Sequence, residues 1–203
     1  GALPFYRGRN PLNWALINGE NNFGITVHYV DAGIDTGDII EQRIYPIEES
    51  DTYKNLLETA STECANVLYP ALKSIKNNTV SVKKQSDIHP VGTYFGARTW
   101  GDEKIDFSWG AARISDFVKA VCSPAPGARF FCGHIEYALE KVIFIDDAPS
   151  YIATLGEIVG RTAAGNVVKV GDSTLLMCLV REISSNEVSK PFVPNFKIGT
   201  RLI

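Results

Sequence analysis

The sequence GITVHYVDAGIDTGDII, residues 24–40, decides how the first part of this chain folds. Apolar and polar side chains alternate over residues 25–30, which is the pattern of a half-buried strand. Residues 31–37 then place two glycines and three turn-forming polar side chains before a second apolar run. We therefore predict two strands, 24–30 and 38–47, joined by a tight loop. Loops held between strand ends often display functional groups.

Helices are predicted on both sides of this strand pair. The preceding segment, GALPFYRGRNPLNWALINGE, is broken by Pro4 and Gly8, and Asn10 before Pro11 suits the start of a short helix over residues 10–18. After the second strand, residues 50–52 offer a helix N-cap. Apolar residues then recur at helical spacing as far as residue 75, which predicts a core-covering helix over 51–76 of about seven turns.

The remainder of the chain contains a polar stretch, then a predicted helix, and then a series of predicted short strands. Residues 77–104 are polar, with a short strand possible at 80–85 and an irregular linker over 92–99. A helix with an apolar face is expected after Trp109. Glycine-punctuated apolar runs then predict five short strands, at 128–133, 134–145, 156–161, 166–170 and 174–182. Such a density of short strands favours a small barrel, with His134 in one of its strands.

Four motifs at the start of the chain carry a family resemblance. They are LPxYRGxxP (3–11), WAxxxGE (14–20), GxTxH (24–28) and DTGDII (35–40). In this order and spacing they resemble the folate-dependent formyltransferases, a family that includes methionyl-tRNA, glycinamide ribonucleotide and nucleotide-amino-sugar formyltransferases. The RGRNPLNW version is most similar to the sugar-modifying enzymes of the lipid A aminoarabinose pathway.

The resemblance implies an α/β fold in two domains. Residues 1–97 would be the C-terminal portion of a Rossmann-like formyltransferase catalytic domain, and 98–203 a small open, OB-like β-barrel, closed by a segment similar to FVPNFKIGTRL (192–202). The one methionine is Met177, and the Asn-x-His of the family would precede Gly1. We therefore expect the N-terminal half of the catalytic domain to be absent and this stretch alone to be inactive.

The resemblance also implies site residues. Asp35 would be the Asp of the family's Asn-His-Asp set, with Asp38 as the alternative, while His28 is expected to have a hydrogen-bonded structural role. The cosubstrate 10-formyltetrahydrofolate would contact the loop through its pterin, although a plain connection between strands remains open; these candidates are Asp31, Ala32, Ile34 and Asp35.

The acceptor is expected to lie along the segment that leads into the first helix, on Tyr6, Arg7, Arg9 and Asn13. A guanidinium there could bind phosphate or a carboxylate bidentately, although either arginine could instead pair with a structural carboxylate. Trp14 is expected to pack in the core rather than to stack on a ligand.

Composition narrows the function classes. The net charge is −3, with 45% hydrophobic and 21% charged residues, and no apolar run approaches the length of a membrane helix. Four cysteines without paired spacing predict reduced, mostly core-packed thiols in a cytoplasmic protein and no metal. Basic and acidic residues balance beyond residue 98. This balance favours a nucleotide-linked amino sugar as acceptor over methionyl-tRNA. A non-catalytic binding or assembly module is the alternative of another class.

Overall fold

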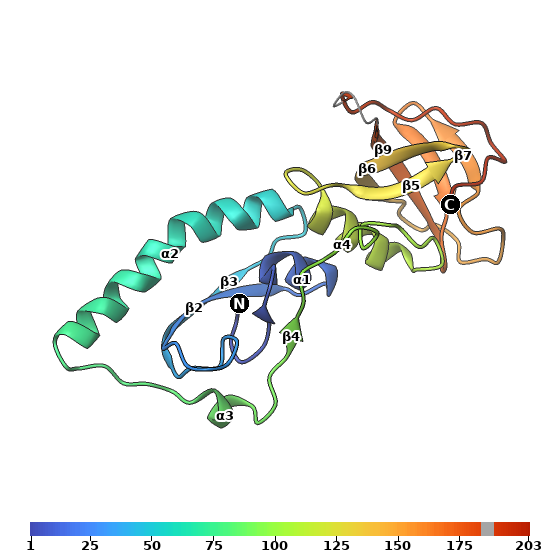
Figure 1. The fold of residues 1–203 in the computed structure, drawn as a ribbon. Helices are drawn as coiled ribbons and strands as arrows, with labels where there is room; N and C mark the ends of the chain where they lie inside the picture. Colours follow the sequence, from blue (N-terminus) through green and yellow to red (C-terminus); the bar gives the residue numbers. More distant parts are fainter. Residues whose placement is uncertain (184–188) are drawn as a thin grey trace. The chain divides into compact units, whose positions relative to one another are not determined.

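The computed structural model describes residues 1–183 and 189–203. The chain forms two compact units, Gly1–Arg98 and Thr99–Ile203, whose helices and strands can be followed in Figure 1. Among the described residues, no helix has both the length and the hydrophobicity that crossing a bilayer requires.

The first unit is built around an antiparallel pair of strands. Its elements, in chain order, are β1 (Arg7–Gly8), α1 (Pro11–Ile17), β2 (Asn22–His28), β3 (Ile39–Pro46), α2 (Tyr53–Lys76), α3 (Gln85–Ile88) and β4 (Tyr94–Phe95). Strands β2 and β3 pair antiparallel, as the alternating pattern predicts. Strand β4 pairs in parallel with β1. Residues 92–99 were predicted as an irregular linker; they instead bring the end of this unit back to its beginning.

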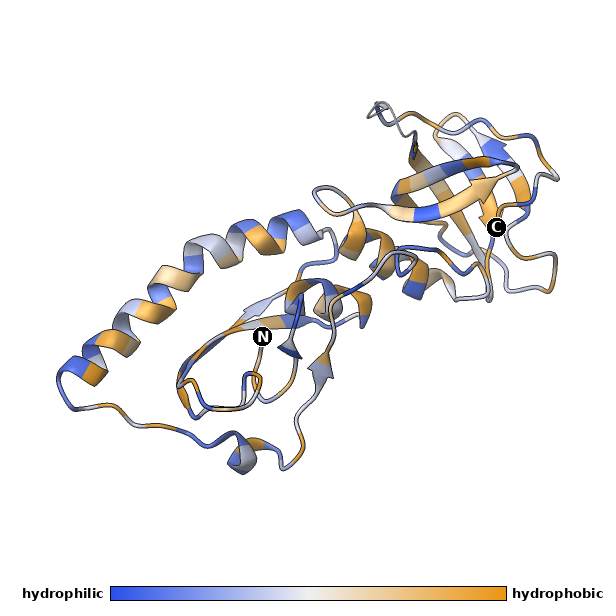
Figure 2. Ribbon diagram, viewed as in Figure 1, coloured by the Kyte–Doolittle hydropathy of each residue, from blue (hydrophilic) through white to orange (hydrophobic). Residues whose placement is uncertain are grey.

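Helix α2 has the predicted length, but its predicted burial is wrong. It begins after Thr52, whose N–H donates to the Asn55 side chain at 2.9 Å. The buried positions are Leu56, Val67 and Ala71. The residues that directly follow them, Leu57, Leu68 and Leu72, are 37%, 45% and 54% exposed. One residue turns the helix by about 100°, so a single row of side chains is covered and the next row, with Cys64, is not. Figure 2 shows hydrophobic residues along much of this helix.

The second unit is an antiparallel sheet with one helix. Its elements are α4 (Ala111–Val121), β5 (Ala128–Cys132), β6 (Ile135–Phe144), β7 (Ile158–Thr162), β8 (Gly165–Lys169) and β9 (Thr174–Glu182). The strands lie in the order β5-β6-β9-β8-β7. Side chains from α4 and the sheet form an apolar core, and its fully buried members include Ile114, Val121, Phe130, Leu139 and Leu175. His134 was predicted in a strand; it lies in the turn between β5 and β6, because the chain reverses there.

The C-terminal segment hydrogen-bonds to both edges of this sheet. Ile203 N–H donates to the carbonyl of Phe131 in β5 at 3.0 Å, and the Ile158 N–H of β7 donates to the Thr200 carbonyl at 2.8 Å. Edge strands left unpaired invite association with other chains. The established arrangement is a five-stranded antiparallel sheet with both edges engaged. The open barrel stays a prediction.

The cysteines are all free thiols, and two of the four lie in the core. Cys122 and Cys178 are buried, Cys132 is partly exposed and Cys64 is exposed. Burial raises the pKa of the Cys132 and Cys178 thiols. These two thiols are therefore poor nucleophiles at neutral pH.

Candidate functional site

Asp35 lies in the loop between β2 and β3, with its carboxylate directed at β1. Its backbone is in the left-handed region, with φ of 53°, which aspartate tolerates better than most residues. Its Oδ2 accepts a hydrogen bond from the Gly8 N–H at 2.8 Å. Its side chain is 39% exposed, and its Oδ1 lies 3.7 Å from His28 Nε2. A carboxylate in this position is anchored on one oxygen and still accessible to solvent.

A glycine sets the path of the loop just after Asp35. A Cβ built at Gly37 would lie 1.7 Å from the Tyr29 carbonyl oxygen, so only glycine permits this close approach. The Tyr29 N–H also donates to the Asp38 carbonyl at 3.0 Å. The two ends of the loop are therefore clamped together, and the residues between them project outward.

Three of the four residues predicted to contact the cosubstrate are among the projecting residues. Asp31, Ala32 and Ile34 are exposed, with Ile34 at 65%. The Asp31 carboxylate accepts a hydrogen bond from the Thr36 hydroxyl at 2.5 Å and another from the Gly33 N–H at 3.0 Å. Donation from Thr36, and then from Gly33, lowers the pKa of Asp31 below its usual value. The loop is thus shaped by an internal turn and exposes apolar side chains, among them Val30 and Ile34.

Arg7 is placed differently from the prediction that it binds substrate. It is only 9% exposed. Its Nε and Nη2 donate to Gln85 Oε1 at 3.0 and 2.7 Å, and its Nη1 donates to the Tyr94 hydroxyl at 3.0 Å. The alternative prediction was that Arg7 pairs with a structural carboxylate, but its observed partners are the amide of Gln85 and the phenol of Tyr94. This guanidinium is therefore committed to holding β1, α3 and β4 together.

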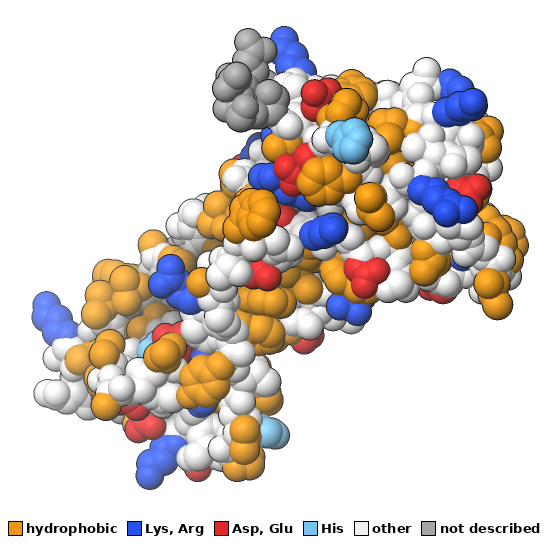
Figure 3. All heavy atoms as spheres, turned by 45° about the vertical axis from the view of Figure 1, so that its right-hand side comes forward, with side chains coloured by type: hydrophobic (Ala, Val, Ile, Leu, Met, Phe, Trp, Pro, Cys, Tyr) orange, Lys and Arg blue, Asp and Glu red, His pale blue; other side chains and the backbone are white. Residues whose placement is uncertain are grey.

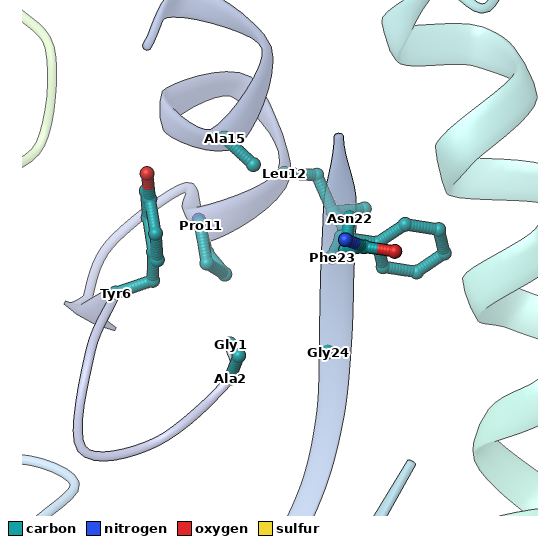
Figure 4. Close-up of a pocket in the computed structure, with 9 residues that line it drawn as sticks. All are labelled: Gly1, Ala2, Tyr6, Pro11, Leu12, Ala15, Asn22, Phe23 and Gly24. Atoms are coloured by element: carbon teal, nitrogen blue, oxygen red, sulfur yellow. The ribbon is translucent and has the colours of Figure 1, made fainter. Parts of the chain in front are cut away.

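Tyr6 borders a small pocket, shown in Figure 4. The pocket is lined by Gly1, Ala2, Tyr6, Pro11, Leu12, Ala15, Asn22, Phe23 and Gly24. Its volume of about 10 Å³ is room for about one water molecule, too small for a sugar. The Tyr6 hydroxyl donates to Glu20 at 2.5 Å. Burial, and then this hydrogen bond, raise the pKa of Tyr6, so the hydroxyl stays a donor at neutral pH.

The other two predicted acceptor-binding residues differ in exposure: Asn13 is buried and Arg9 is exposed. Asn13 is only 4% exposed, in helix α1. Arg9 is exposed, while its backbone N–H donates to the Phe95 carbonyl at 2.9 Å. Trp14 is half-buried, with its ring 5.1 Å from that of Phe95, which agrees with a packing role. Of the four, Arg9 is the side chain available to an external anion.

Two residues near Asp35 were not assigned to the site from the sequence. His28 was expected to be structural, and its Nδ1 does lie 2.8 Å from the Tyr29 carbonyl, but its other nitrogen faces Asp35. Gln85 was not singled out, because a polar residue in a polar stretch carries no local signal. Its Nε2 donates to the carbonyls of Asp35 and Gly37 at 2.8 and 2.7 Å.

The arrangement favours proton handling. It supplies an accessible carboxylate, an adjacent imidazole and an exposed guanidinium on neighbouring segments. A carboxylate that is held in place and reachable can accept a proton from a reacting group. Within residues 1–183 and 189–203, no group of three or more His, Cys, Asp or Glu side chains gathers to hold a metal ion.

Comparison with family models matches both units. Residues 2–72 match the model described as formyl transferase, and residues 99–190 match the formyl transferase C-terminal domain. The first match contains the Asp35 loop and the Arg7–Arg9 segment. It ends before Gln85.

Solved structures of low sequence identity share the fold. An N-formyltransferase from Helicobacter canadensis, in complex with folinic acid and dTDP-3-aminofucose, has a TM-score of 0.67 at 22% identity, over 94% of this chain and 64% of that one. HypX from Aquifex aeolicus, in complex with tetrahydrofolic acid, has a TM-score of 0.64 at 18% identity, over 92% and 32%. Methionyl-tRNA formyltransferase from Clostridium thermocellum has a TM-score of 0.59 at 24% identity, over 71% and 61%. The chain thus spans less than two thirds of the length of each.

Proposed function

Because this chain belongs to the formyltransferase family, we propose that the protein transfers a formyl group from 10-formyltetrahydrofolate to a primary amine, with Asp35 as the carboxylate that handles the protons. The observation that carries the proposal is the Asp35 side chain, held at 2.8 Å by the Gly8 N–H and left 39% exposed within the matched segment. It rests on this geometry and on the family's chemistry together.

The reaction assigns Asp35 one task at the start and one at the end. The neutral amine nitrogen attacks the formyl carbon, and a carbon–nitrogen bond forms while the formyl oxygen becomes an oxyanion. Asp35 accepts the proton that the attacking nitrogen must lose. The bond from the formyl carbon to N10 of the folate then breaks, and Asp35 returns the proton to N10. The oxyanion needs donors, a role that the resemblance gives to an Asn and a His assigned to no residue here.

The loop of Asp31, Ala32 and Ile34 is the proposed folate contact. These three residues are exposed, and Ile34 offers an apolar surface beside Asp35. Flat heteroaromatic rings are commonly held by apolar contact with a few backbone hydrogen bonds that fix orientation. Folinic acid in the Helicobacter canadensis structure and tetrahydrofolic acid in HypX support this ligand class.

We propose a nucleotide-linked amino sugar as the acceptor. The net charge is −3, and on the face that Figure 3 shows, Lys and Arg side chains are scattered among Asp and Glu. A tRNA-binding face needs many phosphate contacts, whereas a sugar nucleotide carries two phosphates that one or two arginines can bind. Arg9 is the proposed phosphate contact, because Arg7 is committed to Gln85.

The second unit is proposed to be an open barrel. The antiparallel strand order and the hydrogen bonds from the C-terminal segment to both edges support it. The four free thiols agree with a reducing, cytoplasmic location, which is part of the same proposal.

The test is formylation by the full-length protein with 10-formyltetrahydrofolate and each acceptor in turn. We expect turnover with a nucleotide-linked amino sugar and none with methionyl-initiator-tRNA. Formylation of the charged tRNA alone would replace the sugar with tRNA as acceptor. Failure with every primary amine, while a known formyltransferase works in parallel, would reject formyl transfer itself.

A further inference from the structure

The side chain of Gln85 uses its whole hydrogen-bonding capacity around Asp35. It is 3% exposed. Its Oε1 accepts two hydrogen bonds from Arg7, and its Nε2 donates two, to the backbone carbonyls of Asp35 and Gly37. A guanidinium can only donate and a carbonyl can only accept, so one orientation of the amide satisfies all four partners. A buried, fully satisfied polar group of this kind fixes the groups around it.

The backbone beside Gln85 is itself anchored. Lys83 and Ile39 exchange two backbone hydrogen bonds, each 2.9 Å long, which tie this stretch to the start of β3. Gln85 then begins helix α3, and its carbonyl accepts from the His89 N–H at 3.1 Å. The amide therefore extends from a fixed base, rather than adapting to the loop that it contacts.

We propose that Gln85 is a positioning residue that fixes the Asp35 turn against the Arg7–Gly8 strand. The carboxylate is held twice over: Gly8 binds its Oδ2, and Gln85 binds the carbonyls on either side of the turn. Oδ1, on the side of His28, is left to receive the proton. The inference rests on the proposed function, because the position of Asp35 matters to the reaction only if Asp35 takes part in it.

The variant Gln85→Glu tests whether Gln85 positions Asp35 or only stabilises the unit. In Gln85→Glu the carboxylate still accepts from Arg7 and gains an ion pair, so the contact to Arg7 is kept. It loses both N–H donors, however, and turns an anionic oxygen toward two carbonyls. We expect the kcat of the full-length enzyme to fall about tenfold or more, with the KM for the acceptor within about twofold, because small displacements of a reacting group are costly.

Gln42 provides the matched control. Its Nε2 donates to the Leu3 carbonyl at 2.9 Å and to the Thr26 hydroxyl at 2.8 Å, in the same unit but without contact to Asp35. Gln42→Glu makes the same chemical change and should leave kcat within about twofold of wild type. Thermal unfolding of both variants distinguishes a loss of stability from a loss of position. A kcat for Gln85→Glu within about twofold of wild type would overturn the proposal.

Amide hydrogen exchange at Gly8 tests the same inference without turnover. This N–H donates to Asp35, so a displaced turn exposes it, and we expect exchange about tenfold faster in Gln85→Glu and unchanged in Gln42→Glu. If the wild-type protein formylates nothing, faster Gly8 exchange upholds the positioning while the proposed function fails. Unchanged Gly8 exchange overturns the positioning. Should Gln85→Glu fail to fold, Gln85→Asn, one methylene shorter, is measured in the same two assays.

Discussion

The first unit buries eight apolar side chains among residues 1–98, whereas the described part of residues 99–203 buries 22. The second unit is held by apolar contacts among α4 and its sheet, which are non-directional and roughly proportional to buried area. Both units also bury polar groups, but the first unit, with few buried apolar side chains, depends more on directional bonds such as those between Arg7 and Gln85. The difference indicates where function is sensitive: one lost hydrogen bond can displace the Asp35 loop, while the second unit responds to lost volume.

The largest effect is expected at Asp35. Asp35→Asn keeps the shape but removes the proton acceptor, so we expect kcat for formyl transfer to fall by about 100- to 10,000-fold. Initial rates of tetrahydrofolate formation by the full-length protein measure it. Asp38→Asn, three residues away, is the control and should leave kcat nearly unchanged. Equal losses of kcat in the two variants would mean that both substitutions disturb the loop, and would contradict a specific role for the Asp35 carboxylate.

The apolar core of the second unit should give the largest loss of stability. Phe130 is fully buried in β5, with its ring 5.6 Å from that of Tyr137. Phe130→Ala is expected to lower the free energy of unfolding by about 3–5 kcal/mol. Phe144→Ala, on β6 but 43% exposed, should cost much less. Denaturant unfolding of both variants decides the matter, and similar costs would contradict the description of this core.

In the first unit, replacing a single glycine is expected to reduce both stability and formyl transfer. Gly8 has φ of +94°, and a Cβ there would lie 2.4 Å from the Phe95 carbonyl oxygen. Gly8→Ala is expected to cost about 1–3 kcal/mol and to reduce formyl transfer, because the same residue supplies the N–H that holds Asp35. A Cβ added at Gly96 would meet no atom within 4 Å, and the φ of Gly96 is not positive, so Gly96→Ala is the matched control. Unchanged formyl transfer in Gly8→Ala would contradict the role of Gly8 in holding Asp35.

The smallest effect is electrostatic and lies in the exposed loop. The Thr36 hydroxyl and the Gly33 N–H stabilise the charged form of Asp31, so its pKa lies below the usual 3.8. Their contribution to loop order is present above that usual value and is lost as pH falls through the lowered pKa. Thr36→Val should raise the pKa of Asp31 toward 3.8, as measured by NMR titration of its carboxyl carbon. Thr62→Val, in helix α2, should leave it unchanged; no shift in Thr36→Val would contradict the assigned cause.

The longer strands and helices could be predicted because their signals are local, whereas β1, α3 and β4 were missed. The strand expected at 80–85 is only a bridge at Lys83, followed by α3. The alternation over 25–30 indicates β2, although the strand runs over Asn22–His28 rather than 24–30, and the turn residues of 31–37 indicate the loop that carries Asp35. The family resemblance drawn from four short motifs is confirmed by the matches over residues 2–72 and 99–190.

The contacts that position the site could not be predicted, because their partners are far apart in the chain. Gln85 lies 78 residues from Arg7 and 50 from Asp35. No local pattern distinguishes an arginine that binds a buried amide from one that faces solvent, so Arg7 was expected to bind substrate. The exposed row of α2 was missed for a related reason: helical spacing identifies apolar positions but not what covers them.

The most direct test of formyl transfer follows the one-carbon unit itself. The full-length protein is incubated with 10-formyltetrahydrofolate labelled with ¹³C in the formyl group and with a nucleotide-linked amino sugar, and the ¹³C spectrum is recorded. The account predicts one labelled formamide on the sugar nitrogen for each tetrahydrofolate released, in wild type and not in Asp35→Asn. Label that stays on the folate, or that appears only as formate, would contradict it.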